Sequence, residues 1–142
     1  MTLAKLFPKL ALATLVAASL LVPTARAGEN DPMGFWLTED SSAVVRIEPC
    51  GAMLCGEIAW SDKPADAKGR PLCSRAILGE LVKTGTSTWG RGWIYSPKTD
   101  DKYPATLTLT PDGTLAIHVA AGLLGRDLQW IRPSQPPTAC AP

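Results

Sequence analysis

The sequence predicts an all-β domain, folded as a single antiparallel up-and-down barrel of about eight strands. Three observations lead to this fold class. Short apolar runs alternate with polar residues at period two, and all 12 glycines and 11 of the 13 prolines lie after residue 27, where they separate these runs. No window in that part keeps a helical period for three turns. With 142 residues, the chain is long enough for one compact domain but hardly for two.

The first three expected strands span residues 34–39, 43–48 and 53–60. A turn at Asp40-Ser41-Ser42 separates the first from the second. In the second strand, the apolar residues at positions 43, 45 and 47 share one face, while Val44, Arg46 and Glu48 share the other. This alternation is typical of a half-buried strand. The third strand returns from a hairpin at residues 50–55.

The fourth and fifth expected strands span residues 77–83 and 89–95. Residues 61–70 precede them and form the longest expected loop, because they are polar and have no apolar rhythm. The fifth strand contains Gly90 and Gly92. Glycines inside a strand indicate a bulge or a sharp bend, and such curvature favours a barrel over a flat sheet.

The last three expected strands span residues 103–110, 115–120 and 128–132. Leucines alternate with threonines in the first of them, and His118 lies on the face opposite Leu115, Ile117 and Val119 in the second. Turns are expected at 96–101 and at 111–113. Eight strands joined by short turns favour closure, and the interior of such a barrel is either filled with side chains or holds one small ligand.

Residues 1–27 have the three parts of a secretory signal peptide. Lys5 and Lys9 form the positive end, residues 10–22 form a short apolar stretch, and Ala25-Arg26-Ala27 forms a small-x-small site, so we expect cleavage after Ala27. Thirteen residues are too few to span a hydrocarbon core of about 30 Å. We expect a periplasmic or secreted bacterial protein, with a barrel domain at 28–133, a proline-rich tail at 134–142 and no transmembrane segment.

The charge of the mature chain argues against nucleic acid as a partner. Residues 1–27 carry three basic and no acidic side chains, so their removal changes the formal net charge from +1 to −2. A nucleic-acid-binding protein normally has a basic surplus that replaces the counterions of phosphates.

The four cysteines all lie after residue 27, and an even number of cysteines in an exported domain favours disulfides. Of the three pairings, we expect Cys50 with Cys55 and Cys73 with Cys140. Cys50 and Cys55 flank a hairpin connection that can bring their Cα atoms within the roughly 4.4–6.8 Å of a bridge. The alternative is a four-thiolate zinc site, which the spacing disfavours because it lacks two short ligand pairs.

Five motifs follow one another along the chain. They are Gly34-Phe35-Trp36, Arg46-Ile47-Glu48-x-Cys50-Gly51 leading to Leu54-Cys55-Gly56-Glu57-Ile58, Arg70-Pro71-Leu72-Cys73, Trp93-Ile94-Tyr95-x-Pro97 and Leu124-Gly125-Arg126-x-x-x-Trp130-x-Arg132. Together they resemble the DUF2147 family, a group of exported bacterial proteins without a known function. The resemblance spans about residues 31–132 and implies a lipocalin-like or calycin-like barrel. In such barrels a Gly-x-Trp of the first strand packs under an arginine from the last, and Trp36 and Arg132 are the matching positions. We expect Trp36, Arg132 and Trp130 to be structural.

Residues for catalysis are sparse. His118 is the only histidine, and no serine or cysteine is clearly paired with it. The adjacent carboxylates Asp100-Asp101 fall in an expected turn, where a capping role is favoured. We find no metal-ligand cluster and no cofactor motif, so we expect no metal, no cofactor and no enzymatic activity.

The five tryptophans suggest binding, because an indole can stack on a lipid chain, a ring or a sugar face. Trp60 and Trp89 are expected at strand ends beside loops, where they can line a barrel mouth. Together with Trp93, Tyr95 and His118 they form the candidate ligand-binding set.

Two functions are compatible with this sequence. The leading hypothesis is a non-enzymatic protein that binds a small hydrophobic or amphipathic molecule in or near its barrel. The alternative is a filled barrel that serves as a structural or protein-interaction module of the cell envelope, with another envelope protein as its partner. A cavity of a few hundred Å³ would favour the first, and a packed interior the second.

Overall fold

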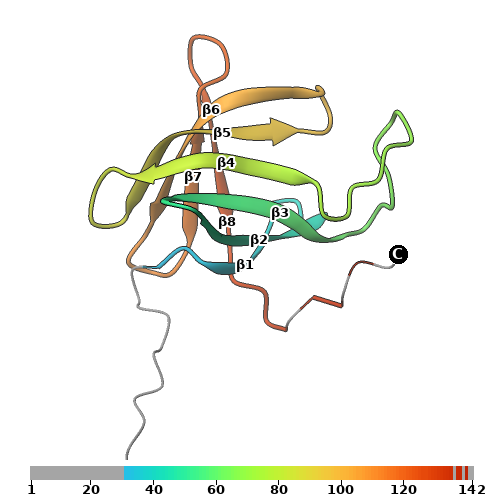
Figure 1. Ribbon diagram of the computed structural model, residues 1–142, viewed down its shortest axis with the longest axis horizontal. Coiled ribbons are helices and arrows are strands. Elements are labelled where there is room, and N and C mark those ends of the chain that lie inside the picture. Colours follow the sequence, from blue (N-terminus) through green and yellow to red (C-terminus); the bar gives the residue numbers. More distant parts are fainter. Residues whose placement is uncertain (1–30, 136, 139, 141–142) are drawn as a thin grey trace, which may run out of the picture.

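The computed structural model describes residues 31–135, 137, 138 and 140, which form one eight-stranded antiparallel sheet (Figure 1). The strands are β1 (Gly34–Leu37), β2 (Ala43–Cys50), β3 (Met53–Ser61), β4 (Ala76–Lys83), β5 (Thr88–Ser96), β6 (Asp101–Leu109), β7 (Leu115–Val119) and β8 (Arg126–Trp130). Each strand pairs with the next one in chain order. The predicted all-β, up-and-down architecture is confirmed, and every predicted strand overlaps one observed strand.

The connections between strands lie at two ends of the sheet. The β2–β3, β4–β5 and β6–β7 turns lie at the end where the chain enters β1, which we call the entry end (Figure 1). The β1–β2, β3–β4 and β5–β6 connections lie at the opposite end, which we call the loop end. The longest connection, residues 62–75 between β3 and β4, is therefore at the loop end.

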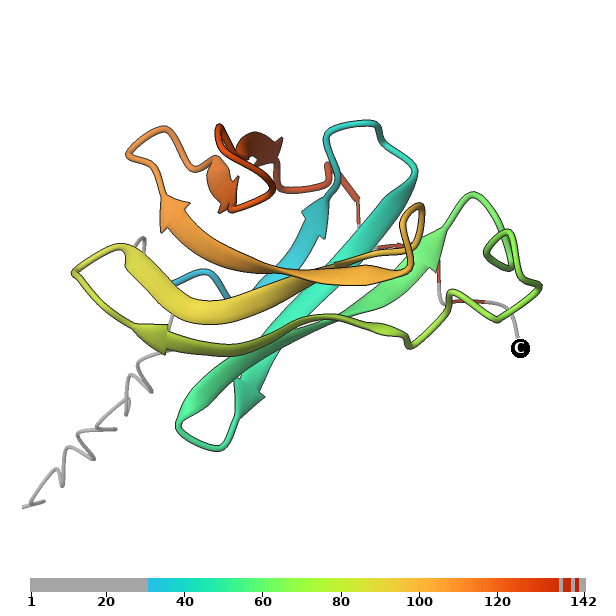
Figure 2. The ribbon, with the colours of Figure 1, turned by 90° about the horizontal axis from the view of Figure 1, so that it is seen from above.

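The barrel is nearly closed, and one backbone bridge joins its two outermost strands. The N–H of Leu37 donates to the carbonyl of Ile131 (2.8 Å), and the N–H of Ile131 donates to the carbonyl of Leu37 (3.1 Å). β1 ends at Leu37, two residues earlier than predicted, because the Thr38 N–H turns to donate to the carbonyl of Ala43. Figure 2 shows how the sheet curls until β8 approaches β1.

Apolar side chains fill the interior. All eight strands contribute to one cluster of buried apolar residues, and no polar or charged residue belongs to it among the described positions. Trp36 on β1, Leu107 on β6 and Leu115 on β7 are each fully enclosed. An interior packed with such large groups leaves little room for a ligand.

A bulge bends β5 where the sequence has its two glycines. The pairing of β5 with β6 shifts between Trp89 and Gly92, and Arg91 has a φ of +63°. A Cβ on Gly92 would lie 2.8 Å from side-chain carbons of Leu81, which is closer than real Cβ contacts allow. Glycine is therefore required here for β4 and β5 to approach each other.

Two disulfides join Cys50 to Cys55 and Cys73 to Cys140, as expected, with Cα atoms 5.8 Å apart in each. The first closes the β2–β3 hairpin at the entry end. The second bonds Cys140 to Cys73 of the 62–75 loop, which lies at the loop end.

Residues 1–27, with the expected signal peptide and its cleavage site, lie outside the described residues. Of the expected proline-rich tail, positions 134, 135, 137, 138 and 140 are described. Within the described part of the chain, no helix has the length and apolar character needed to cross a membrane.

Candidate functional site

Arg132 lies across the N-terminal segment and over the indole of Trp36. The guanidinium carbon is 3.9 Å from the ring centroid. Its Nη1 donates to the carbonyl of Met33 (2.7 Å) and its Nη2 to the carbonyl of Asp31 (3.1 Å), while the indole Nε1 donates to the carbonyl of Pro32 (2.7 Å). The two side chains thus fasten the chain entry to the end of β8, and partial burial lowers the pKa of Arg132 from its ordinary value.

A hollow of about 370 Å³ opens beside this contact at the entry end, and we call it the entry hollow. Its lining is mostly apolar: Pro32, Met33, Pro49, Leu54 and Trp89, with the charged residues Lys83 and Asp31. The Nζ of Lys83 lies 5.7 Å from the centroid of the Trp89 ring. Trp89 itself is 5% exposed and belongs to the core, so only the margin of its ring borders the hollow.

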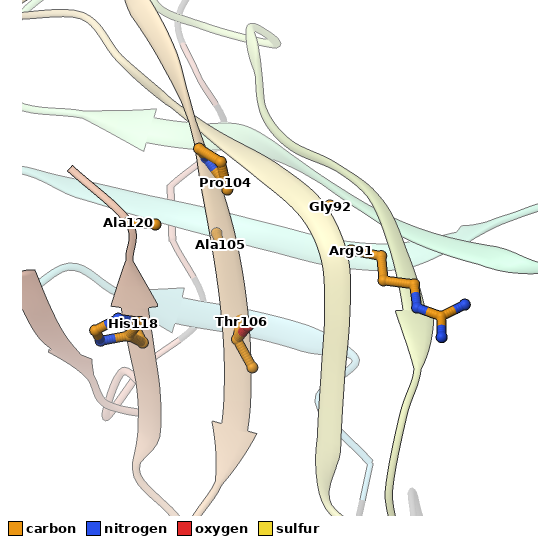
Figure 3. Close-up of a pocket in the computed structure, with 7 residues that line it drawn as sticks. All are labelled: Arg91, Gly92, Pro104, Ala105, Thr106, His118 and Ala120. Atoms are coloured by element: carbon orange, nitrogen blue, oxygen red, sulfur yellow. The ribbon is translucent and has the colours of Figure 1, made fainter. Parts of the chain in front are cut away.

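A second hollow, of about 270 Å³, lies over the outer side of β5, β6 and β7, and we call it the wall hollow (Figure 3). His118 and Thr106, which are cross-strand neighbours, form part of it. The Nδ1 of His118 is 2.7 Å from Oδ1 of Asp127, and both side chains are exposed. In Figure 3 the guanidinium of Arg91 extends away from the other lining residues. Among the described residues, no serine hydroxyl or cysteine thiol is hydrogen-bonded to this imidazole, so it has no nucleophile to activate there.

Trp60 lies on the outer wall of β3, where its cross-strand partner is Val44 of β2. Val44 is only 4% exposed, although it shares the outer face with Arg46 and Glu48. Side chains paired directly across two strands lie close enough to cover each other, and Trp60 is paired with Val44 in this way. Trp60 is half-buried and so contributes to the packing of the wall.

Trp93 also lies on an outer face, opposite the core residue Ile94. A Cβ on its cross-strand partner Gly79 would collide with the indole, so the ring lies directly on that strand. Its Nε1 donates to Oε2 of Glu80 (2.8 Å), and the Nζ of Lys102 is 3.8 Å from the ring centroid. The ring is therefore in contact with β4 and with the ammonium of Lys102, and it lines neither of the two hollows.

Tyr95 belongs to a network of charged residues at the loop end that was not predicted from the sequence. Its hydroxyl donates to Oδ1 of Asp100 (2.6 Å), which also accepts from Nη2 of Arg70 (2.7 Å). The Nζ of Lys68 donates to the other oxygen of Asp100 (2.6 Å). The carboxylate of Asp100 raises the pKa of Tyr95, and the three donors hold the pKa of Asp100 well below its usual range.

Asp66 is the centre of the same network, and its side chain is almost fully enclosed. Its Oδ2 accepts from Nη1 of Arg75 and from Nε of Arg70, both at 2.8 Å, and its Oδ1 accepts from the backbone N–H groups of Lys68 and Arg70. Arg75, followed by the other donors, holds the pKa of Asp66 far below its usual range. The network fastens the 62–75 loop to the start of β6. A sequence signal was present in Asp66-x-Lys68-Gly69-Arg70, which is typical of a turn capped by an aspartate.

The five candidate ligand-binding residues do not converge on one cavity. Trp89 lies in the core and borders the entry hollow, and His118 borders the wall hollow. Trp60 and Trp93 lie on the outer wall, and Tyr95 is partly buried against the core and belongs to the network at the loop end. Among the described residues, no group of three His, Cys, Asp or Glu side chains is placed to hold a metal ion.

Residues 34–132 match the family model described as "Uncharacterized protein conserved in bacteria (DUF2147)". The chain belongs to the DUF2147 family. The match covers all eight strands and ends at Arg132, the residue that lies over Trp36.

The DUF2147 domain has a solved structural neighbour in protein HP1028 from Helicobacter pylori, which is described as belonging to the lipocalin family. The TM-score is 0.59 at 18% sequence identity, and the superposition covers 72% of this chain and 82% of that one. At this identity the likeness shows a shared fold, so the DUF2147 barrel is lipocalin-like in architecture, as expected.

The curated protein HIR1 from Gibberella zeae is 26% identical to this DUF2147 chain over 84 residues, or 59% of the chain. The matched part spans only 8% of the length of HIR1.

Proposed function

We propose that this DUF2147 protein is an exported, non-enzymatic binding module of the cell envelope that recognises its partner on the outside of the barrel. The single observation that carries the proposal is the filled interior. Apolar side chains from every strand occupy the space in which a lipocalin-like barrel would hold a ligand, and Trp36, Leu107 and Leu115 are fully enclosed there. Both hollows described above open to the surface.

Three observations support export. The family is described as bacterial, and both disulfides are of the kind that persist in an oxidising compartment. The leader-like composition of residues 1–27 agrees with a periplasmic or secreted location.

The non-enzymatic assignment is supported by the geometry at His118. Its polar partner is Asp127, and both groups are exposed to water, which weakens the coupling between them. The strongly perturbed carboxylates, Asp66 and Asp100, are each saturated with donors and hold the 62–75 loop in place.

A second candidate function is favoured by the entry hollow, namely binding of a small amphipathic anion such as a fatty acid. The walls are apolar, and the ammonium of Lys83 has no carboxylate partner among the described ion pairs. The nearby carboxylate of Asp31 accepts from the N–H of Met33. A volume of about 370 Å³ is at the lower end of the range for small-ligand sites.

The proposed function is tested by asking whether the interior admits an apolar guest. Protein purified from its own envelope is examined by native mass spectrometry, and the refolded protein is titrated with benzene or xenon. We expect no lipid adduct and no guest in the wild type. The variant Leu107→Ala, which opens a cavity at a fully enclosed position, should take up the guest and serves as the positive control. A wild type that carries a specific lipid in its interior would contradict the proposal.

The second candidate is tested with dodecanoate and tryptophan fluorescence. Binding at the entry hollow should perturb Trp89 emission and should weaken in Lys83→Gln. The matched control Lys98→Gln, at an exposed lysine outside this hollow, should bind like the wild type. Equal binding by both variants would exclude the entry hollow as the site.

A further inference from the structure

The β7–β8 turn presents two leucines to solvent. Leu123 is 105% exposed and Leu124 is 95% exposed, whereas the other large exposed apolar residues, Met53 and Ile131, are 37% and 52% exposed. The turn stands clear of the barrel at the top of Figure 1. Adjacent leucines held fully in water are unfavourable unless something covers them, so this tip indicates a contact surface.

The turn is held in shape by the strands on which it stands. The N–H of Ala120 donates to the carbonyl of Pro104 (2.9 Å), and the N–H of Ala121 donates to that of Val119 (3.0 Å). Gly125 has a φ of +64°, and a Cβ there would lie 2.9 Å from the ring of His118. The two leucines thus lie on a turn of defined conformation, so binding does not have to overcome the conformational entropy of ordering this turn.

One cation without an ion-pair partner among the described residues lies directly beside the tip. Residues 120–125 carry no charge, and the first charged residue after them is Arg126, which is exposed and has no ion-pair partner among the described residues. The next residue, Asp127, is also exposed, and its Oδ1 lies 2.7 Å from Nδ1 of His118 on β7. Two apolar side chains followed by one free cation match the order of acyl chain and anionic headgroup in a bilayer.

The shape of the tip distinguishes a bilayer from a protein partner. A protruding turn with small flanking residues offers little area for a matching protein surface, whereas fluid lipid closes around any convex apolar group. We propose that Leu123 and Leu124 insert into the interfacial region of an anionic phospholipid bilayer, with Arg126 at the level of the headgroups. The inference rests on the proposed function, because it names the surface on which outside recognition takes place.

Vesicle cosedimentation tests the proposal. Wild-type protein should sediment with vesicles of phosphatidylethanolamine and phosphatidylglycerol. The double variant Leu123→Ser/Leu124→Ser should partition about a hundredfold less, because each leucine contributes about tenfold when it leaves water. Arg126→Gln should weaken binding about fivefold on these vesicles and much less on phosphatidylcholine alone.

Met53→Ser is the matched control, since it removes an exposed apolar side chain from a different hairpin and should bind like the wild type. The thermal midpoints of the two leucine substitutions should equal that of the wild type, so that a binding loss cannot come from unfolding. No vesicle binding by the wild type, equal binding by the double leucine variant, or leucine-dependent capture of a protein in place of lipid would overturn the inference. If the wild type takes up no apolar guest and also does not bind vesicles, only this inference is contradicted. A lipid found inside the barrel would contradict the proposed function.

Discussion

Arg132 lies 3.9 Å above the indole of Trp36 and is one residue away from Ile131, whose backbone bridges to Leu37. The first and last strands are therefore connected in two ways, by the Leu37–Ile131 backbone bridge and by the contact between the Arg132 and Trp36 side chains. Because only one backbone bridge joins these strands among the described residues, the Arg132–Trp36 contact has a large effect on whether the barrel stays closed.

Arg132→Ala should lower the free energy of unfolding by about 2–4 kcal/mol. It removes a cation–π contact worth about 0.5–2 kcal/mol and charge-assisted hydrogen bonds to the carbonyls of Met33 and Asp31 worth about 1.5–3 kcal/mol. Arg132→Lys should recover only part of the loss, because a single ammonium cannot reach both carbonyls, whereas the two Nη groups of the guanidinium do. Urea unfolding measures both. Arg126→Ala, at the exposed arginine that begins β8, is the control, and an equal loss there would show that the contact is unimportant.

Gly79→Ala should destabilise the barrel by about 1–3 kcal/mol, because a Cβ at this position overlaps the Trp93 ring. The cost should fall when the ring is absent. A double-mutant cycle with Trp93→Ala measures this difference. Gly79→Ala should lower the free energy of unfolding less in the Trp93→Ala background than in the wild type. Additive effects of the two substitutions would mean that the indole does not rest on β4.

The two disulfides should contribute unequally. Cys73 and Cys140 are 67 residues apart, whereas Cys50 and Cys55 are 5 apart, so the chain-entropy model gives about 4 kcal/mol for the first and about 2 kcal/mol for the second. Paired Cys→Ser replacements followed by thermal unfolding compare them. A larger loss from the Cys50–Cys55 pair would contradict the loop-length argument.

The loop network should make stability depend on pH on the acidic side. Asp66 and Asp100 have folded-state pKa values below those of the unfolded chain, so their contribution is complete above the ordinary carboxylate range and is lost as pH falls through and below it. Urea midpoints measured from neutral pH downwards should therefore decline. Asp66→Asn should flatten the decline and lower the neutral-pH plateau, whereas Asp112→Asn, in the β6–β7 turn, should change the profile less. Parallel profiles for the wild type and Asp66→Asn would refute this account.

The fold was predictable because strand alternation and turn residues are local signals. Leu115, Ile117 and Val119 all face the core, as their spacing indicates. The glycines of β5 indicated its bulge for a local steric reason. The early end of β1 was not predictable, since it depends on a hydrogen bond from Thr38 to Ala43.

The candidate site was less predictable, because it depends on residues far apart in the chain. Asp66 and Asp100 belong to one network only because the 62–75 loop crosses to the start of β6. Trp60 was expected at the barrel mouth because of its place at a strand end, and Trp93 was expected to take part in ligand binding, but their pairing with Val44 and Gly79 places both on the outer wall. The exposed Leu123-Leu124 pair had a sequence signal in the uncharged run of residues 120–125.

The Cys73–Cys140 bridge has a consequence for proteolysis. It closes a covalent ring that includes the five strands from β4 to β8. A protease that nicks the backbone anywhere inside this ring, the projecting β7–β8 turn included, produces two pieces that remain attached to each other. The clipped molecule would keep its mass apart from one added water and would separate into fragments only after reduction.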